Sequence, residues 1–235
     1  MPVQTLTTPP RRIRILGEEE IDALYGFPHF TDEERLEYFS LTPPEKAVLE
    51  QLRSLKSRIS FILQLGYFKS HHLFFVFTLA DVAEDVRYIQ EQYFPHVPLT
   101  DLDITKVTRL KQQGMILELF RYRSCAAPQR RALRAKARQA ATISAKPLYV
   151  FRELLHYLKE HRLVAPGYSA MQDIVGQALT YEQDRLATIV SEALTHQERD
   201  ALDRLLEDTP GLYEITQLRR EPKDFSAKEI KRERQ

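Results

Sequence analysis

The sequence holds one cysteine and seven glycines in 235 residues, and it has no long apolar run. No stretch approaches the roughly 18 consecutive apolar residues of a membrane-spanning helix, which argues against a transmembrane protein. The first ten residues show neither a charged-then-apolar signal pattern nor a small-residue cleavage site. Together with the single cysteine, these absences predict a soluble protein in a reducing, cytoplasmic setting.

Catalytic and metal-binding patterns are also missing. So few glycines leave no glycine-rich loop to cradle a phosphate, which argues against a nucleotide-driven enzyme. The seven histidines show no HExxH or other metal-ligand spacing on one helical face. Cys125 has no predicted histidine partner, and a lone intracellular cysteine is more often inert. The sequence therefore predicts no catalytic residue, metal or cofactor in this segment, and no small-molecule substrate.

Helix signals dominate what is present, and 43% hydrophobic residues are enough to fill genuine cores. Residues 59–68 are apolar nearly all round, which predicts the central helix of a first core. Only residues 73–79 could form a strand, and no second alternating run exists to pair with it. Capping pairs, in which a cap and a residue three positions on exchange hydrogen bonds, recur along the chain. The pairs are Thr31 with Glu34, Thr42 with Glu45, Asp81 with Glu84, Thr180 with Gln183, Thr195 with Glu198, and Ser226 with Glu229.

These patterns predict an all-α protein with two helical bundles, helix-turn-helix-like, joined by a long basic helix. The predicted divisions are an N-terminal DNA-binding domain over residues 1–124, a basic linker helix over 125–146, and a second helical domain over 147–235. Apolar residues at helical spacing predict three further core faces. The faces are Val82, Val86, Ile89 and Tyr93; Leu148, Phe151, Leu155 and Leu158; and Leu186, Ile189, Val190, Ala193 and Leu194.

The net charge of +1 conceals strong alternation along the chain. Residues 18–50 hold ten acids against two bases, whereas residues 106–146 hold eleven bases against one acid, a net of +10. A block so unbalanced is solvated, bound to an acidic protein surface, or bound to nucleic acid. All three alternatives stay open at this point, and nucleic acid is the one favoured.

Two segments of the basic block suit nucleic acid in different ways. Residues 103–120 predict an amphipathic recognition helix, with Val107, Leu110, Ile116, Leu117 and Phe120 on its core side. Its arginine and glutamine side chains can pair with base edges, and its lysines can contact phosphates. Residues 129–145 predict an alanine-rich helix whose arginines form one stripe suited to a phosphate backbone. The candidate DNA-binding residues are Lys106, Arg109, Lys111, Gln112, Gln113, Arg121, Arg123, Arg130, Arg131, Arg134, Lys136 and Arg138.

Seven segments in a fixed order resemble the amino-terminal region of the Tn-three family of replicative transposases. They are RILGEEEIDALYG, FTDEERLEYFSLTPPEKAVL, SRISFILQLGYFK, DVAEDVRYIQEQY, DITKVTRLKQQGMILELFRYR, LVAPGYSAMQDIVGQAL and PKDFSAKEI. The resemblance implies binding to double-stranded DNA at the terminal inverted repeats of a transposon. Strand transfer in that family uses magnesium and a DDE carboxylate triad in a domain far downstream. The resemblance therefore implies end recognition without catalysis for this segment.

Two other functions stay open on the sequence alone. A stand-alone protein of this kind would act as a repressor or competitor at transposon ends. A helical protein-interaction scaffold would use the basic block for an acidic partner, and the acidic residues 163–217 for self-association. Only the DNA-binding alternatives require the transposon end to be bound more tightly than random duplex.

Overall fold

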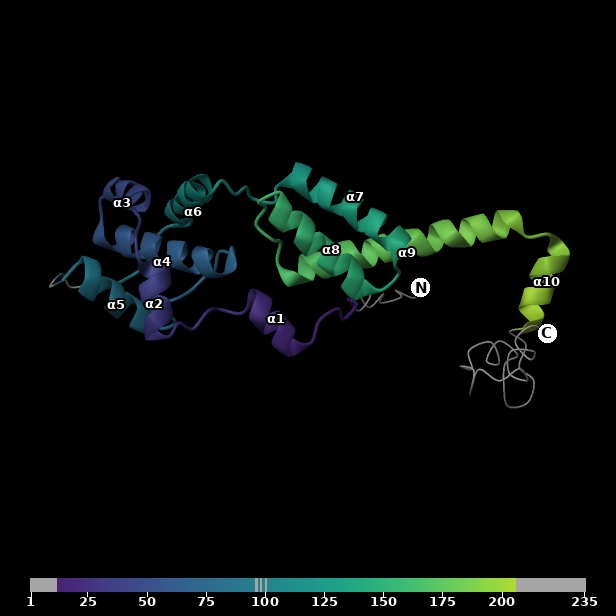
Figure 1. Ribbon diagram of the computed structural model, residues 1–235, viewed down its shortest axis with the longest axis horizontal. Helices are drawn as coiled ribbons and strands as arrows, with labels where there is room; N and C mark the ends of the chain where they lie inside the picture. Colours follow the sequence, from purple (N-terminus) through teal and green to yellow (C-terminus); the bar gives the residue numbers. More distant parts are fainter. Residues whose placement is uncertain (1–11, 96, 98, 100, 206–235) are drawn as a thin grey trace, which may run out of the picture. The chain divides into compact units, whose positions relative to one another are not determined.

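The computed structural model describes residues 12–95, 97, 99 and 101–205, and within that part it is helical with no strand (Figure 1). The helices are α1 (Glu18–Tyr25), α2 (Asp32–Phe39), α3 (Pro43–Glu50), α4 (Leu55–His71), α5 (Ala83–Tyr93), α6 (Lys106–Phe120), α7 (Ala127–Ile143), α8 (Pro147–Glu160), α9 (Tyr168–Ala193) and α10 (His196–Leu205). The prediction of an all-α fold is confirmed. The chain divides into two compact units, residues 1–182 and 183–235.

Three of the predicted helix starts are confirmed, those at Thr31, Thr42 and Thr195. In each, the glutamate three residues on accepts a hydrogen bond from the backbone amide of the cap, at 2.8 to 2.9 Å. At Thr31 the exchange is reciprocal, because its hydroxyl accepts from the Glu34 amide at 3.3 Å. These bonds satisfy amides that a first helical turn leaves without partners.

Two predicted helix starts are wrong, and one lies outside the described residues. α5 begins at Ala83, because the Asp81 carboxylate accepts from the Thr78 amide at 2.7 Å and so closes a turn before the helix. Thr180 lies within α9, which continues unbroken because no glycine or proline follows to end it. The predicted cap at Ser226 lies outside the described residues.

The first hydrophobic cluster is built around α4, with α2, α3, α5 and α6 packed against that helix (Figure 1). All ten residues from 59 to 68 are buried, which confirms the predicted central helix. Gly66 permits an especially close approach, since a Cβ placed there would lie 2.4 Å from the Phe39 ring. The end of α2 can therefore rest directly on the α4 backbone.

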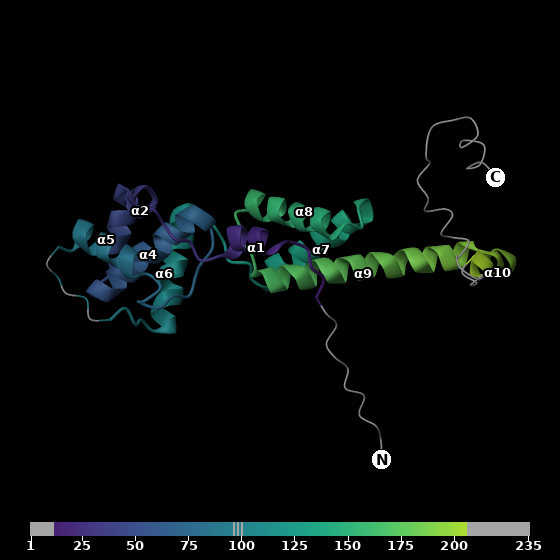
Figure 2. The same ribbon diagram turned by 90° about the horizontal axis from the view of Figure 1, so that it is seen from below.

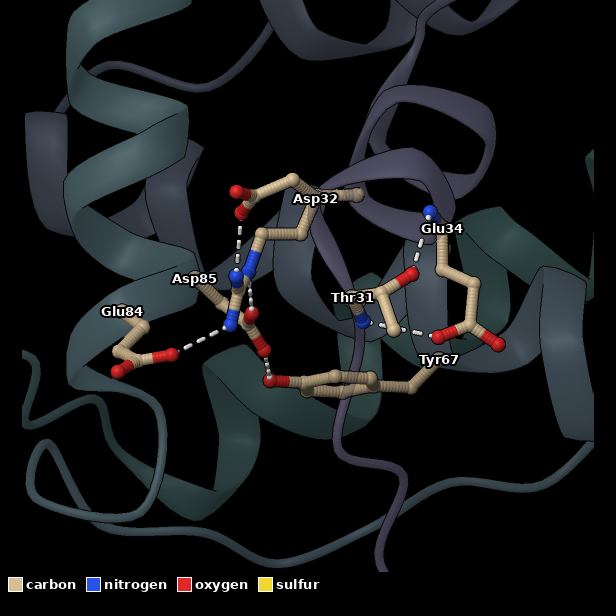
Figure 3. Close-up of polar contacts among 7 residues, drawn as sticks. Thr31, Asp32, Glu34, Tyr67, Glu84 and Asp85 are labelled. Carbon is tan, nitrogen blue, oxygen red and sulfur yellow. Dashed lines mark hydrogen bonds and ion pairs between the residues drawn. The ribbon is translucent and has the colours of Figure 1, made fainter.

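Charged side chains tie three helices of this cluster together (Figure 3). Arg35 of α2 donates to Asp85 at 2.8 Å and to Glu84 at 2.7 Å, both on α5, and to Asp32 at 2.8 Å. The Tyr67 hydroxyl of α4 donates to the other Asp85 oxygen at 2.6 Å. Burial, and then this hydrogen bond, raise the pKa of Tyr67. The buried Asp85 carboxylate is thus satisfied by two donors, and the group holds the helices in register.

The second hydrophobic cluster combines α7, α8 and the first part of α9 (Figure 2). Leu133 and Ala137 of α7 are fully buried, and the small alanines let α8 pack closely against that face. The predicted role of residues 125–146 as a linker is therefore wrong, since α7 is a packed member of this cluster. Leu16 is buried in the same cluster, so the predicted domain over residues 1–124 is not separate from α7 and α8.

Two of the predicted core faces are confirmed, and one is wrong. Val86 and Ile89 of α5 are buried, as are Phe151 and Leu158 of α8. The face further along α9 is exposed: Leu186 and Ile189 are each 47% accessible and Val190 is 50% accessible. Helical spacing places such residues on one side but does not supply a neighbour to cover them. No helix among the described residues combines the length and apolar character needed to cross a bilayer.

Candidate nucleic-acid interface

α6 begins after Thr105, whose hydroxyl accepts from the Thr108 amide at 3.2 Å. Its buried side consists of Gln112 and Ile116, which are four residues apart and therefore lie on one face of the helix. Val107 is 77% exposed and Leu110 is 54% exposed, roughly opposite that buried side. The prediction that these two residues face the core is wrong, because the packing of α6 on α4 turns them to solvent.

The burial of Gln112 removes it from the predicted base-reading set. Its Nε2 donates to the Ser57 carbonyl at 2.8 Å, and its Oε1 accepts from Gln64 Nε2 at 2.8 Å and from Ser60 Oγ at 3.2 Å. These bonds join α6 to α4 inside the first cluster, where no base edge can reach. The adjacent Gln113 is half-buried and faces a large hollow instead. The sequence alone does not show which of the two adjacent glutamines is buried and which lines the hollow.

The remaining candidates on α6 differ in exposure. Lys106 and Lys111 are exposed and available to phosphates. Arg109 is half-buried and lines a hollow of about 400 Å³ beside Phe77 and Asp101. The other residues that line this hollow are mostly apolar, with two acids, Asp101 and Asp103.

α7 presents the clearest positive surface. Arg130, Arg131 and Arg134 are exposed, and no ion pair joins any of them to an acid among the described residues. We call these three residues the arginine stripe. The other two candidates on this helix have partners. The Lys136 ammonium lies 3.1 Å from Glu153, and the Arg138 guanidinium lies 4.3 Å from the centre of the Tyr181 ring.

The connection between α6 and α7 is anchored to the turn that comes after α8. The Arg123 amide donates to the Arg162 carbonyl at 2.9 Å, and the Val164 amide donates to the Arg123 carbonyl at 3.0 Å. The Arg123 side chain also donates to the His161 carbonyl at 3.4 Å. Arg121 is exposed at the end of α6, with left-handed backbone at φ 55°. These contacts hold α6 and α7 in a defined relation within the first unit.

A hollow of about 690 Å³ opens between α6, α7 and the start of α9. We call it the α6–α7 hollow. Among the predicted candidates it brings together Gln113, Arg130 and Arg134. Much of the remaining lining is apolar and comes from distant segments: Phe74, Leu110, Leu117, Val164, Ala165, Ala170 and Ile174. No pattern in the sequence connects these segments, so only the packing of the two clusters reveals the hollow.

Two titratable groups also line the hollow, the Cys125 thiol and the Asp173 carboxylate. Burial raises the pKa of the Cys125 thiol, and the Arg130 guanidinium only partly offsets that rise. Cys125 is therefore protonated and unreactive at neutral pH. The Asp173 carboxylate, which also lines the hollow, accepts a hydrogen bond from Arg12 Nε at 2.8 Å and forms an ion pair with it. Among the described residues, no group of three or more His, Cys, Asp or Glu side chains is placed to hold a metal ion.

A protein-family match covers most of the chain. Residues 15–178 match the family described as Domain of unknown function (DUF4158). The chain belongs to this family. The DUF4158 match covers both hydrophobic clusters and the α6–α7 hollow, and it ends within α9. No curated protein matches the chain.

Proposed function

We propose that this DUF4158 chain binds double-stranded DNA sequence-specifically at the terminal inverted repeats of a transposon. In this proposal it is the N-terminal part of a Tn-three family transposase, and strand transfer with magnesium belongs to a separate catalytic domain. The segment itself is then not an enzyme and needs no cofactor. The arginine stripe of α7 is the observation that carries the proposal.

Basic side chains that are not already paired with an acid of the chain are the ones most available to DNA phosphates. Several bases elsewhere in the first unit are already paired with acids, as Lys69 is with Glu45 at 3.0 Å and Lys136 is with Glu153 at 3.1 Å. The guanidiniums of the stripe have no such partner among the described residues, and they lie one after another along one helix. A DNA backbone supplies phosphates at regular intervals, and each contact releases condensed counterions.

Sequence specificity needs additional groups that reach base edges. Gln113 and Arg109 are the candidates that remain on α6, since an amide pairs with adenine and a guanidinium pairs with guanine. Lys106 and Lys111 lie on the same helix, and their contacts with phosphates would position it on the DNA backbone. This division of roles is consistent with the resemblance of residues 103–123 to the transposase region.

The test is a titration of labelled duplex with the chain at several salt concentrations. One duplex carries the terminal inverted repeat of the element that encodes the chain, and the other carries the same bases in scrambled order. We expect the repeat to bind at least about tenfold more tightly, with a slope near −5 in log affinity against log salt for roughly six phosphates. Equal affinity for both duplexes contradicts sequence recognition, and a slope near zero contradicts the phosphate contacts.

The exposed apolar face of α9 favours a second candidate function, association with another copy of the chain. Leu186, Ile189 and Val190 lie at helical spacing, and each is about half exposed, at 47%, 47% and 50%. Apolar rows of this kind pair with a matching row in helical assemblies. Sedimentation equilibrium of the chain and of Ile189→Asp tests this. Self-association that Ile189→Asp abolishes supports it, and a monomer at all concentrations contradicts it.

A further inference from the structure

Three kinds of group that line the α6–α7 hollow can contact a ligand, and a fourth, the Asp173 carboxylate, is already paired with Arg12 at 2.8 Å. Many of its lining residues are apolar, and we call these its apolar floor; among them Phe74 makes a stacked contact with Phe68, at 5.0 Å between ring centres. Its lining also includes two basic residues, Arg130 and Arg134, and one amide residue, Gln113. A ligand that satisfies all three has a flat apolar part, a hydrogen-bonding edge and an anionic group.

The volume of the hollow further limits which ligands can occupy it. Its volume of about 690 Å³ falls within the range of sites that take small molecules. Paired bases in a duplex present only their edges in the grooves, because their faces are stacked on neighbouring pairs. A stacked pair cannot lay a base face on the apolar floor, whereas a nucleotide removed from the stack can.

Gly114 supplies an independent reason to expect an occupant. It lies within α6, where glycine is less favourable than alanine, yet a Cβ at this position would meet no atom within 4 Å. Packing within the chain therefore does not require glycine here, in contrast to Gly66, where a Cβ would lie 2.4 Å from Phe39. Gly114 lines the hollow, and its missing side chain keeps that wall open to close approach.

We propose that the α6–α7 hollow binds one unpaired nucleotide, with the base on the apolar floor and the phosphate at Arg130 and Arg134. The amide of Gln113 then pairs with the exposed edge of the base. The nucleotide comes either from a DNA strand, as a base displaced from the duplex, or from free solution. The first source rests on the proposed function, and the second does not.

The test compares a fully paired duplex with the same duplex carrying one unpaired adenine, and it uses free deoxyadenosine monophosphate as a third probe. We expect the chain to bind the duplex with the unpaired base about tenfold more tightly than the paired duplex. Deoxyadenosine monophosphate should bind more tightly than inorganic phosphate, because phosphate alone leaves the apolar floor uncovered.

Gly114→Leu is the decisive variant, since it fills the hollow from an open position on a helix where leucine is well tolerated. It should lose the preference for the unpaired base while its affinity for paired duplex stays within about twofold, because the arginine stripe is intact. Gly176→Ala is the matched control: it also replaces a helical glycine, has only Ile13 at 4.0 Å, and lies outside the hollow. A melting temperature at or above that of the parent shows that each variant is folded.

The outcomes separate this inference from the proposed function. Failure to bind either duplex, with monophosphate binding that Gly114→Leu abolishes, rejects DNA binding and keeps the nucleotide site with free nucleotide as its source. Binding to duplex with no preference for the unpaired base, and no monophosphate binding beyond that of phosphate, overturns the nucleotide site and keeps DNA binding. A preference that survives Gly114→Leu places the unpaired base elsewhere and also overturns the inference.

Discussion

α6 and α7 carry the same positive block, yet the structure uses the two helices differently. α6 packs on α4, so Gln112 is buried and Arg109 is half-buried, and only its lysines remain fully available. α7 buries a face of leucine and alanines, which leaves its arginines on the open side. Because the buried face of α7 consists of leucine and alanines, all three side chains of the arginine stripe stay exposed. On α6, by contrast, packing buries part of the predicted DNA-binding residues.

The largest expected effect concerns the core on which α6 rests. Leu65→Ala removes a fully buried side chain from α4 and should lower the free energy of unfolding by about 2–5 kcal/mol. The loss combines the transfer of apolar atoms with the cavity left behind. Chemical denaturation monitored by circular dichroism measures it. An unchanged midpoint would mean that α4 is not the packed axis of the first cluster.

The next-largest expected effect is a loss of DNA affinity on removal of the arginine stripe of α7. Replacing Arg130, Arg131 and Arg134 together with alanine should lower the affinity for duplex on the order of a hundredfold at roughly 0.1 M salt. The salt slope should fall by about three units, and repeat and scrambled duplex should weaken alike, because phosphates carry no sequence information. Stability should stay nearly constant, since these side chains are exposed. A selective loss on the repeat alone would give the stripe a base-reading role.

The third prediction compares how two adjacent glutamines of α6 contribute to the stability of the fold. Gln112→Ala should lower the free energy of unfolding by about 1–3 kcal/mol, because Gln64 Nε2, Ser60 Oγ and the Ser57 carbonyl each lose a hydrogen bond to Gln112. Gln113→Ala should change stability by less than about 0.5 kcal/mol. Thermal melts of both variants test the pair. Equal losses would mean that Gln113 is packed as tightly as its neighbour.

The smallest effects distinguish the two kinds of base on α6. Arg109→Ala should weaken binding to the repeat by about 1–3 kcal/mol and to scrambled duplex far less, if its guanidinium reads a guanine. Lys106→Ala should weaken both and reduce the salt slope by about one unit. Salt titrations of each variant on both duplexes give the comparison. An unchanged ratio of affinities in Arg109→Ala would assign Arg109 to the hollow it lines and leave Gln113 as the reader.

Local signals predicted the parts of the molecule that depend on near neighbours in the chain. The capping boxes at Thr31 and Thr195 are examples, because cap and glutamate are three residues apart and need nothing else. The apolar run 59–68 is another, since a helix apolar on every side is stable only when enclosed. The face at Leu186 shows the limit of such signals, because its periodicity is genuine while its burial depends on a neighbour.

The sequence by itself determined an all-α chain, the enclosed α4 helix and a +10 block between acidic flanks. Helix formation and charge density are properties of short segments, and they can be summed along the chain. The tertiary structure alone decided that Gln112 is buried while Gln113 lines the hollow, that α7 packs rather than links, and that Phe74, Gly114 and Ile174 meet at one hollow. These outcomes depend on which helices pack together, α6 on α4 in the first cluster and α7 on α8 in the second. Residues far apart in sequence acquire a common role only through that packing.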